Sequence, residues 1–209
     1  MKEKCIIFDM DGTLIDSSAA MTQSVNFVRD SIGLAPIGKK ELEYHINQPD
    51  QHLPMIFYGT DEYDPNHRAL FKEHYMQSSI TSVLYPGVKE MLHELNAKAH
   101  LCIATNASDF FARRMLEALH VAEYFSAIVG GNNVSEPKPS PLMVQYLMRE
   151  VDAKPNDTLL IGDSVKDEGA AKNAGIDFIF AEWGYGTAQE ASLRARNVPE
   201  LLRLLKTFI

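Results

Sequence analysis

Short apolar runs without alternating polar positions recur along this chain. Runs of this kind predict strands that are buried on both faces of a sheet. They occupy residues 5–9, 101–105, 126–130, 158–163 and 177–182. Between the last four runs, apolar residues recur at helical spacing in segments 107–120, 140–151 and 165–175. This alternation is typical of an α/β fold with a doubly wound parallel sheet, that is, a Rossmann-like core.

The first two predicted strands are separated by far more chain than a parallel crossover of about a dozen residues requires. Residues 17–33 and 66–80 predict helices within this separation. Prolines between these helices permit only short ones, and they are Pro36, Pro49, Pro54 and Pro65. We therefore predict a small inserted all-helical cap domain. The predicted division is an α/β core at 1–15 and 83–209 and a cap at 16–82, with hinges at 14–17 and 82–87.

Composition and charge narrow the functional classes. The chain of 209 residues has 20 Lys and Arg against 28 Asp and Glu, a formal net charge of −8, and no long basic run, so we expect no nucleic-acid partner. No run of about 18 apolar residues occurs, and the N-terminal apolar segment is too short for a signal peptide. We expect a soluble, cytoplasmic protein without a membrane partner, as a monomer or weak homodimer. Cys5 and Cys102 lie in predicted strands, which favours buried free thiols.

Polar residues follow four of the predicted strands at the sheet edge where such folds bind ligands. At its carboxyl end the first strand carries Asp9 and Asp11, the second Thr105 and Asn106, and the fourth Asp163 and Asp167, while the third leads to Lys138. Carboxylates gathered at one spot repel one another unless a cation lies between them, and Mg²⁺ prefers such oxygen ligands. The lysine and the threonine suit an anion such as a phosphoryl group.

These motifs together resemble the haloacid dehalogenase superfamily, and within it the phosphoglycolate-phosphatase-like branch with a helical cap. The matching motifs are "DMDGT" at 9–13, Thr105, Lys138 in "KPSP", and "GDSVKD" at 162–167, in the same order as in that family. The resemblance covers essentially the whole chain. It implies a Mg²⁺-dependent phosphomonoester hydrolase that acts on a small phosphorylated metabolite through an aspartyl-phosphate intermediate.

The resemblance also implies a role for each motif residue. Asp9 would be the nucleophile, Asp11 the general acid and base, and Lys138 the cation that stabilises the nucleophile and the phosphoryl charge. Mg²⁺ would be held by the carboxylates of Asp9 and Asp163 and by the main-chain carbonyl of Asp11. Substrate contacts would come from Thr105, Asn106, Gly12 and Thr13, and Asp167 would orient Lys138 or a metal-bound water.

Three functions stay open at this point. The first is a phosphatase for a phosphoglycolate-like compound or a sugar phosphate, the second a phosphotransferase of the sugar-phosphomutase type, and the third a non-catalytic phosphate-responsive binding module. Substrate choice should come mainly from the cap. In the cap, "HINQPDQHL" at 45–53 replaces the Gly-containing loop of many relatives, and its Asn47, Gln48 and His52 could contact a leaving group. This departure weakens the expectation that phosphoglycolate itself is the substrate.

Overall fold

A parallel sheet of six strands forms the centre of the computed structural model, which describes residues 2–48 and 51–209. The strand order is β5-β4-β1-β6-β7-β8, and every neighbouring pair is parallel. The strands are β1 (Lys4–Phe8), β4 (Ala99–Thr105), β5 (Phe125–Gly130), β6 (Thr158–Gly162), β7 (Asp177–Ala181) and β8 (Leu193–Ala195). The order changes direction around β1, as in a doubly wound fold. The predicted α/β class is confirmed.

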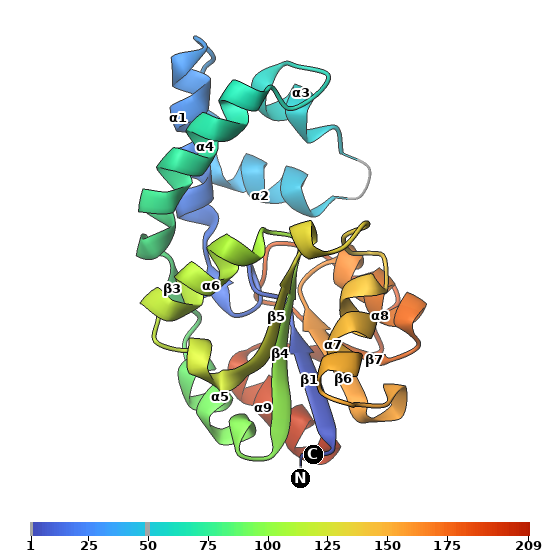
Figure 1. The fold of residues 1–209 in the computed structure, drawn as a ribbon. Helices are drawn as coiled ribbons and strands as arrows, with labels where there is room; N and C mark the ends of the chain where they lie inside the picture. Colours follow the sequence, from blue (N-terminus) through green and yellow to red (C-terminus); the bar gives the residue numbers. More distant parts are fainter. Residues whose placement is uncertain (1, 49–50) are drawn as a thin grey trace.

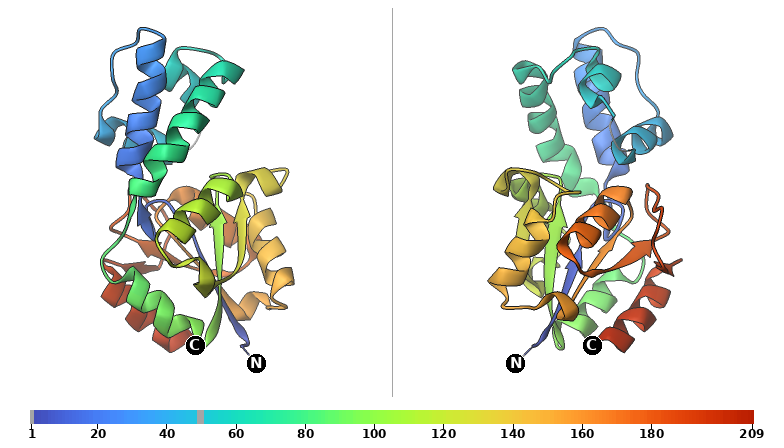
Figure 2. Two further views of the ribbon diagram at one scale, coloured as in Figure 1. Left: turned by 60° about the vertical axis from the view of Figure 1, so that its left-hand side comes forward. Right: turned by 90° about the vertical axis from the view of Figure 1, so that its right-hand side faces the viewer.

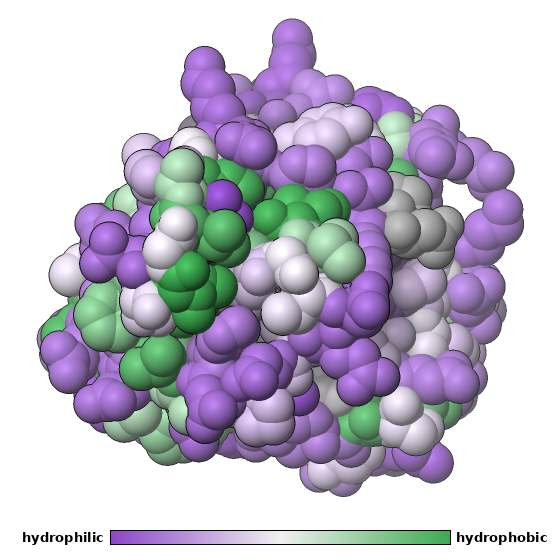
Figure 3. Space-filling view, turned by 90° about the horizontal axis from the view of Figure 1, so that it is seen from above, coloured by the Kyte–Doolittle hydropathy of each residue, from purple (hydrophilic) through white to green (hydrophobic). Residues whose placement is uncertain are grey.

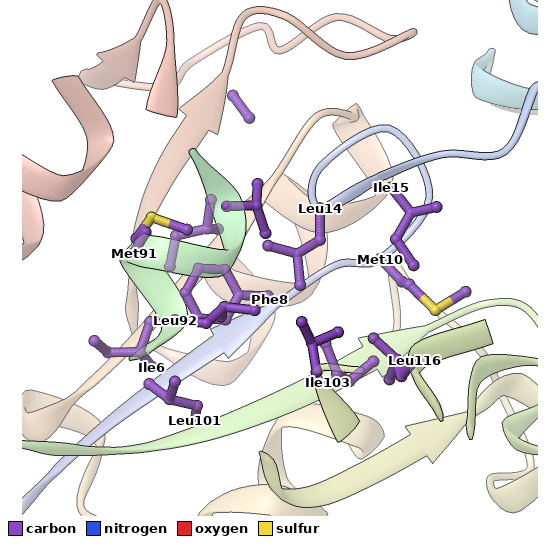
Figure 4. Close-up of a cluster of buried hydrophobic side chains, with 14 of the residues drawn as sticks. Ile6, Phe8, Met10, Leu14, Ile15, Met91, Leu92, Leu101, Ile103 and Leu116 are labelled. Carbon is purple, nitrogen blue, oxygen red and sulfur yellow. The ribbon is translucent and has the colours of Figure 1, made fainter. Parts of the chain in front are cut away.

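Helices cover both faces of this sheet (Figure 1, Figure 2). They are α5 (Val88–Asn96), α6 (Asp109–Ala118), α7 (Leu142–Glu150), α8 (Val165–Ala174) and α9 (Val198–Phe208). Side chains of β1 alternate between the two layers: Ile6 and Phe8 pack with α5, α6 and α9 (Figure 4), whereas Cys5 and Ile7 pack with α7 and α8. This burial on both faces explains why the strand reads as a continuous apolar run. Cys5 and Cys102 are buried free thiols, as expected.

Most of the segment between β1 and β4, from residue 18 to residue 78, forms a group of helices above the sheet, at the end opposite the chain termini (Figure 1). These helices are α1 (Ser18–Ser31), α2 (Lys39–Asn47), α3 (Leu53–Tyr58) and α4 (Pro65–Ser78). A buried apolar cluster that includes Val28, Leu42 and Phe57 holds them together. Viewed from above, apolar patches lie between polar ones on this end of the molecule (Figure 3). The predicted helices at 17–33 and 66–80 and the short helices between them are confirmed.

The chain enters and leaves this group of helices through a short antiparallel pair of strands. Strand β2 (Ile15–Asp16) pairs with β3 (Val83–Leu84), so that Ile15 lies opposite Leu84. The amide of Tyr85 also donates to the carbonyl of Leu14 at 3.0 Å. Both predicted hinge segments are therefore hydrogen-bonded to each other. The assignment of 16–82 as a domain in its own right stays a prediction.

Several elements were not expected from the sequence. They are α5, α9, β8, the β2–β3 pair and four 3₁₀ turns, at Ser79–Thr81, Ala122–Tyr124, Gly131–Asn133 and Pro155–Asp157. Strand β8 has only three residues and carries too little pattern to be recognised. Pro49, one of the prolines expected to interrupt the cap helices, and Asp50, in the loop at 45–53, lie outside the described residues. None of the described helices has the length and apolar character to cross a membrane.

Candidate active site

The ammonium group of Lys138 lies at the centre of the candidate site, at the carboxyl ends of the central strands. Its Nζ donates to Asp9 Oδ1, to the carbonyl oxygen of Ala104 and to Asp167 Oδ1, each at 2.6 Å. Only 4% of Lys138 is exposed, and its three donors have three acceptors. Burial by itself lowers the pKa of Lys138, but the charges of Asp167 and Asp9 outweigh burial and raise it. Lys138 is therefore a permanent positive charge beside Asp9.

The main chain of Lys138 is held by the side chain of Asn106. Asn106 Oδ1 accepts a hydrogen bond from the Lys138 amide, and its Nδ2 donates to the Lys138 carbonyl, both at 2.9 Å. The sequence predicts that Asn106 contacts the phosphate, whereas in the structure both polar atoms of its amide bind the lysine backbone. The preceding Thr105 is buried, and its Oγ1 accepts from the Ala107 amide at 3.1 Å. The Thr105 hydroxyl thus keeps its proton for another acceptor.

Three buried carboxylates form a group that fits a divalent cation. One oxygen each from Asp9, Asp163 and Asp167 lies within 4.8 Å of the others. Burial, and then the charge of Asp167, raise the pKa of Asp163 to about 7. Burial also raises the pKa of Asp9, although Lys138 opposes this. In this cluster one ammonium faces three carboxylates, and a hard divalent cation such as Mg²⁺ would relieve the remaining repulsion.

The loop after β1 brings Asp11 close to Asp9 without joining this acidic group. The amides of Leu14 and Ile15 both donate to the carbonyl of Met10, at 2.9 and 3.0 Å, which folds the loop back on itself. Gly12 has a φ of +91°, and a Cβ at this position would overlap the Asp163 carboxylate. Asp11 Oδ1 accepts a hydrogen bond from the Ser17 hydroxyl. The predicted metal contact through the main-chain carbonyl of Asp11 stays a prediction.

The pKa of the Asp11 carboxyl group is raised by burial and not by a neighbouring carboxylate. Burial raises the pKa of Asp11 despite the Ser17 hydrogen bond and Lys138, which lower it. A carboxyl group with a raised pKa can donate a proton near neutral pH. Thr13, two residues on, is buried, and its hydroxyl has no hydrogen-bond partner among the described residues. The expected contacts of Gly12 and Thr13 with a phosphate stay predictions.

The segment "EWGYG" at 182–186, which the sequence indicates only as a turn with packed aromatics, forms one side of the site. The amide of Tyr185 donates to Asp163 Oδ2 at 2.7 Å. Its hydroxyl oxygen accepts from the Ser17 and Ser18 amides at 2.9 and 3.2 Å and donates to Asp16 Oδ1 at 2.8 Å. Tyr185 therefore connects the acidic group to the first turn of α1. The glycines on either side of Tyr185 are the sequence signal that this segment packs against the site, because a Cβ on Gly184 would overlap the side chain of Asp163.

The site opens into a chamber of about 200 Å³ between the sheet edge and α2. The predicted residues that line it are Asp9, Asp11, Thr105, Asn106, Lys138, Asp163 and Asp167. Asn47, from the loop at 45–53, also lines it, whereas His52 is not among the lining residues and lies 2.5 Å from the carbonyl of Asp61. Lys166 of α8 closes one side, because its Nζ donates to the carbonyl of Ile46 in α2 at 2.9 Å.

Known proteins share this fold and chain length. The family model described as haloacid dehalogenase-like hydrolase matches residues 6–181. The phosphoglycolate phosphatase of Vibrio vulnificus strain CMCP6 is 32% identical over 215 residues, covering 95% of this chain and 94% of the relative. That of Chromobacterium violaceum is 30% identical over 216 residues, covering 97% and 96%. A crystal structure described as a predicted phosphoglycolate phosphatase from Haemophilus somnus 129PT has a TM-score of 0.85 at 26% identity, covering 98% of this chain and 99% of that one.

The chain therefore belongs to the haloacid dehalogenase-like hydrolases. The resemblance expected from the four ordered motifs is confirmed, and the Rossmann-like core that carries those motifs is the fold of the family's solved structures.

Proposed function

We propose that this chain is a Mg²⁺-dependent phosphatase that hydrolyses a phosphomonoester of a small metabolite through an aspartyl-phosphate intermediate. The observation that carries the proposal is the 2.6 Å contact between Lys138 Nζ and Asp9 Oδ1, with Asp11 on the adjoining loop. The phosphoglycolate phosphatases of Vibrio vulnificus and Chromobacterium violaceum support a phosphatase by their similarity.

The residues divide the reaction between them. Asp9 attacks phosphorus with a carboxylate oxygen, so that an O–P bond forms as the bond from phosphorus to the leaving oxygen breaks. Asp11 gives its proton to the leaving alcohol and then takes one from the water that hydrolyses the aspartyl-phosphate. Lys138 fixes the orientation of the Asp9 carboxylate, and the free proton of the Thr105 hydroxyl suits a phosphoryl oxygen.

Within the group formed by Asp9, Asp163 and Asp167, the carboxylates of Asp9 and Asp163 would hold the Mg²⁺ ion. When bound, the ion supplies positive charge that offsets the negative charge of the phosphoryl group beside the carboxylates. Asp167 already accepts from Lys138 Nζ at 2.6 Å and from Ser164 Oγ at 2.5 Å. We therefore assign it mainly to positioning Lys138, and Asp9 and Asp163 to the metal.

The substitution Asp9→Asn tests the nucleophile. We expect steady-state phosphate release to fall by at least about 10³-fold, because an amide is a poor nucleophile and cannot form the acyl phosphate. The fold should survive, since Lys138 keeps its bonds to Asp167 and Ala104. Phosphate release with Mg²⁺ and circular dichroism measure the two effects.

A matched control is Asp157→Asn, which removes a carboxylate that also contacts a lysine, Lys4 at 2.9 Å, but on the surface. Near-normal turnover in Asp9→Asn would contradict the assignment of Asp9 as the nucleophile, and turnover unaffected by chelation would contradict the need for a metal ion.

Product analysis separates the alternative functions. Accumulation of an isomerised sugar phosphate without inorganic phosphate would indicate a mutase, and no turnover of any phosphorylated metabolite would favour a binding module.

A further inference from the structure

A second and larger cavity adjoins the chamber that holds the carboxylates. It measures about 490 Å³ and lies between the inserted helices and the core. Aromatic side chains from both sides line it, and they are Phe57, Tyr58, Tyr63, Phe71, Tyr75 and Phe111. Such a density of rings in one cavity is typical of a site that binds an apolar or aromatic group.

Asp11 and Asn106 line both the chamber and the cavity, so the two spaces meet at the proposed general acid. Under the proposed function, Asp11 gives its proton to the oxygen between the phosphoryl group and the leaving alcohol. The phosphoryl group occupies the chamber beside Asp9 and Lys138. The leaving group must then extend past Asp11 into the aromatic cavity.

The volume of the cavity argues against a very small leaving group. A water molecule takes about 30 Å³ of liquid volume, so the cavity of about 490 Å³ has room for many water molecules beside a two-carbon group such as glycolate. Those water molecules would lie against apolar walls. A ring or an extended apolar group would instead displace that water and gain hydrophobic contact.

Two basic side chains lie on one part of the cavity wall. Arg68 and Lys72 lie one turn apart on α4, and both line the cavity. Within residues 2–48 and 51–209 neither forms an ion pair with a carboxylate. Each lies near an aromatic ring, Arg68 at 5.7 Å from Tyr63 and Lys72 at 5.8 Å from Phe110. Unpaired cations beside an apolar cavity favour an anionic group on the ligand.

We propose that the natural substrate is a phosphate monoester of an aromatic or comparably extended apolar alcohol that carries an anionic group at the end remote from the ester. This inference rests on the proposed function and specifies its substrate class. The aromatic rings hold the body of the leaving group, and Arg68 and Lys72 bind its anionic end.

Four esters test the inference: ethyl phosphate, 2-phosphoglycolate, benzyl phosphate and 4-carboxybenzyl phosphate. Ethanol and benzyl alcohol have similar acidity, so the ratio of their kcat/KM values reports the contacts of the leaving group. We expect benzyl phosphate to exceed both small esters by at least about tenfold. The carboxylate should add about threefold, the contribution of an exposed ion pair.

Two variants locate these effects in the cavity. Leu53→Trp fills space on the cavity wall and should lower the ratio of kcat/KM for benzyl phosphate to that for ethyl phosphate. The double substitution Arg68→Gln and Lys72→Gln should abolish the advantage of 4-carboxybenzyl over benzyl phosphate, and Lys72→Gln alone should reduce it. Lys40→Gln, which removes an exposed cap lysine that does not line the cavity, should leave every ratio unchanged.

The outcomes separate the two proposals. Equal kcat/KM for ethyl and benzyl phosphate, or a preference for 2-phosphoglycolate, would overturn the inference while the proposed phosphatase function stands. Ratios that do not change in Leu53→Trp would also overturn it. Turnover of other phosphate monoesters but of none of these four would overturn this inference alone. Absence of turnover of any phosphorylated metabolite would overturn the proposed function and this inference with it.

Discussion

At the scale of single residues, the site depends on how the backbone of Lys138 is held. The ammonium group needs three acceptors at 2.6 Å at once, and a small shift of the main chain would break this arrangement. Asn106 prevents such a shift by binding both the amide and the carbonyl of Lys138. Its side chain therefore acts on the chemistry through the lysine.

The substitution Asn106→Ala removes both of these hydrogen bonds. We expect kcat to fall by about 10²-fold, the effect of misplacing a catalytic group by about 1 Å, with little change in KM. The matched control is Asn173→Ala, which removes a bond of 3.0 Å to the carbonyl of the next residue in the same loop, Pro139, but at an exposed position. Steady-state kinetics of the two variants measure the difference. A rise in KM with normal kcat would instead indicate that Asn106 contacts the substrate.

At the scale of elements, the segment between β7 and β8 joins the sheet to the inserted helices. Trp183 Nε1 donates to the carbonyl of Thr13 at 3.1 Å. Tyr185 contacts Asp163 through its amide and the first turn of α1 through its hydroxyl. This segment thus holds both the loop that carries Asp11 and the start of α1.

The substitution Tyr185→Phe tests the contact between the Tyr185 hydroxyl and the first turn of α1. It removes the acceptor of two amides and the donor to Asp16, so we expect the free energy of unfolding to fall by about 1–3 kcal/mol. The amide contact with Asp163 is a main-chain bond and should persist. Urea denaturation measures the change, with Tyr146→Phe as the control at an exposed tyrosine. Equal stability of the two variants would show that the hydroxyl contributes little.

Sequence patterns predict those elements and site residues whose signals are local. The apolar run of β1 is recognisable because both of its faces are buried, and Asp9 and Asp163 directly follow the ends of β1 and β6. The contact of Asn106 with Lys138 spans 32 positions and that of Tyr185 with Ser17 spans 168. Neither contact leaves a periodic signal.

At the scale of the whole molecule, buried carboxylates make stability depend on pH and on metal. Burial, with the charge of Asp167, raises the pKa of Asp163 from 3.8 to about 7. The folded protein therefore holds this proton more tightly than the unfolded chain does. Without metal, the free energy of unfolding should fall as pH rises from about 4 to about 7, and this contribution of Asp163 should then become constant.

The substitution Asp163→Asn should remove this part of the pH dependence and raise the Tm of the metal-free protein at pH above 7. Mg²⁺ should raise the Tm of the unsubstituted protein under these conditions and have much less effect on Asp163→Asn. Thermal unfolding with and without Mg²⁺ measures both effects, with Asp177→Asn as the control at an exposed carboxylate. Equal Mg²⁺ stabilisation of Asp163→Asn would contradict the assignment of Asp163 to the metal.

The pairing of Ile15 with Leu84 also has a consequence for chain connectivity. For the sheet, everything between these residues is one long loop whose ends are tied together at its base. The entropy of closing such a loop grows only with the logarithm of its length, so each doubling costs about 0.6 kcal/mol. Insertions or deletions far from the β2–β3 pair should therefore affect the folding of the sheet only weakly. The same core can accept inserted segments of very different size.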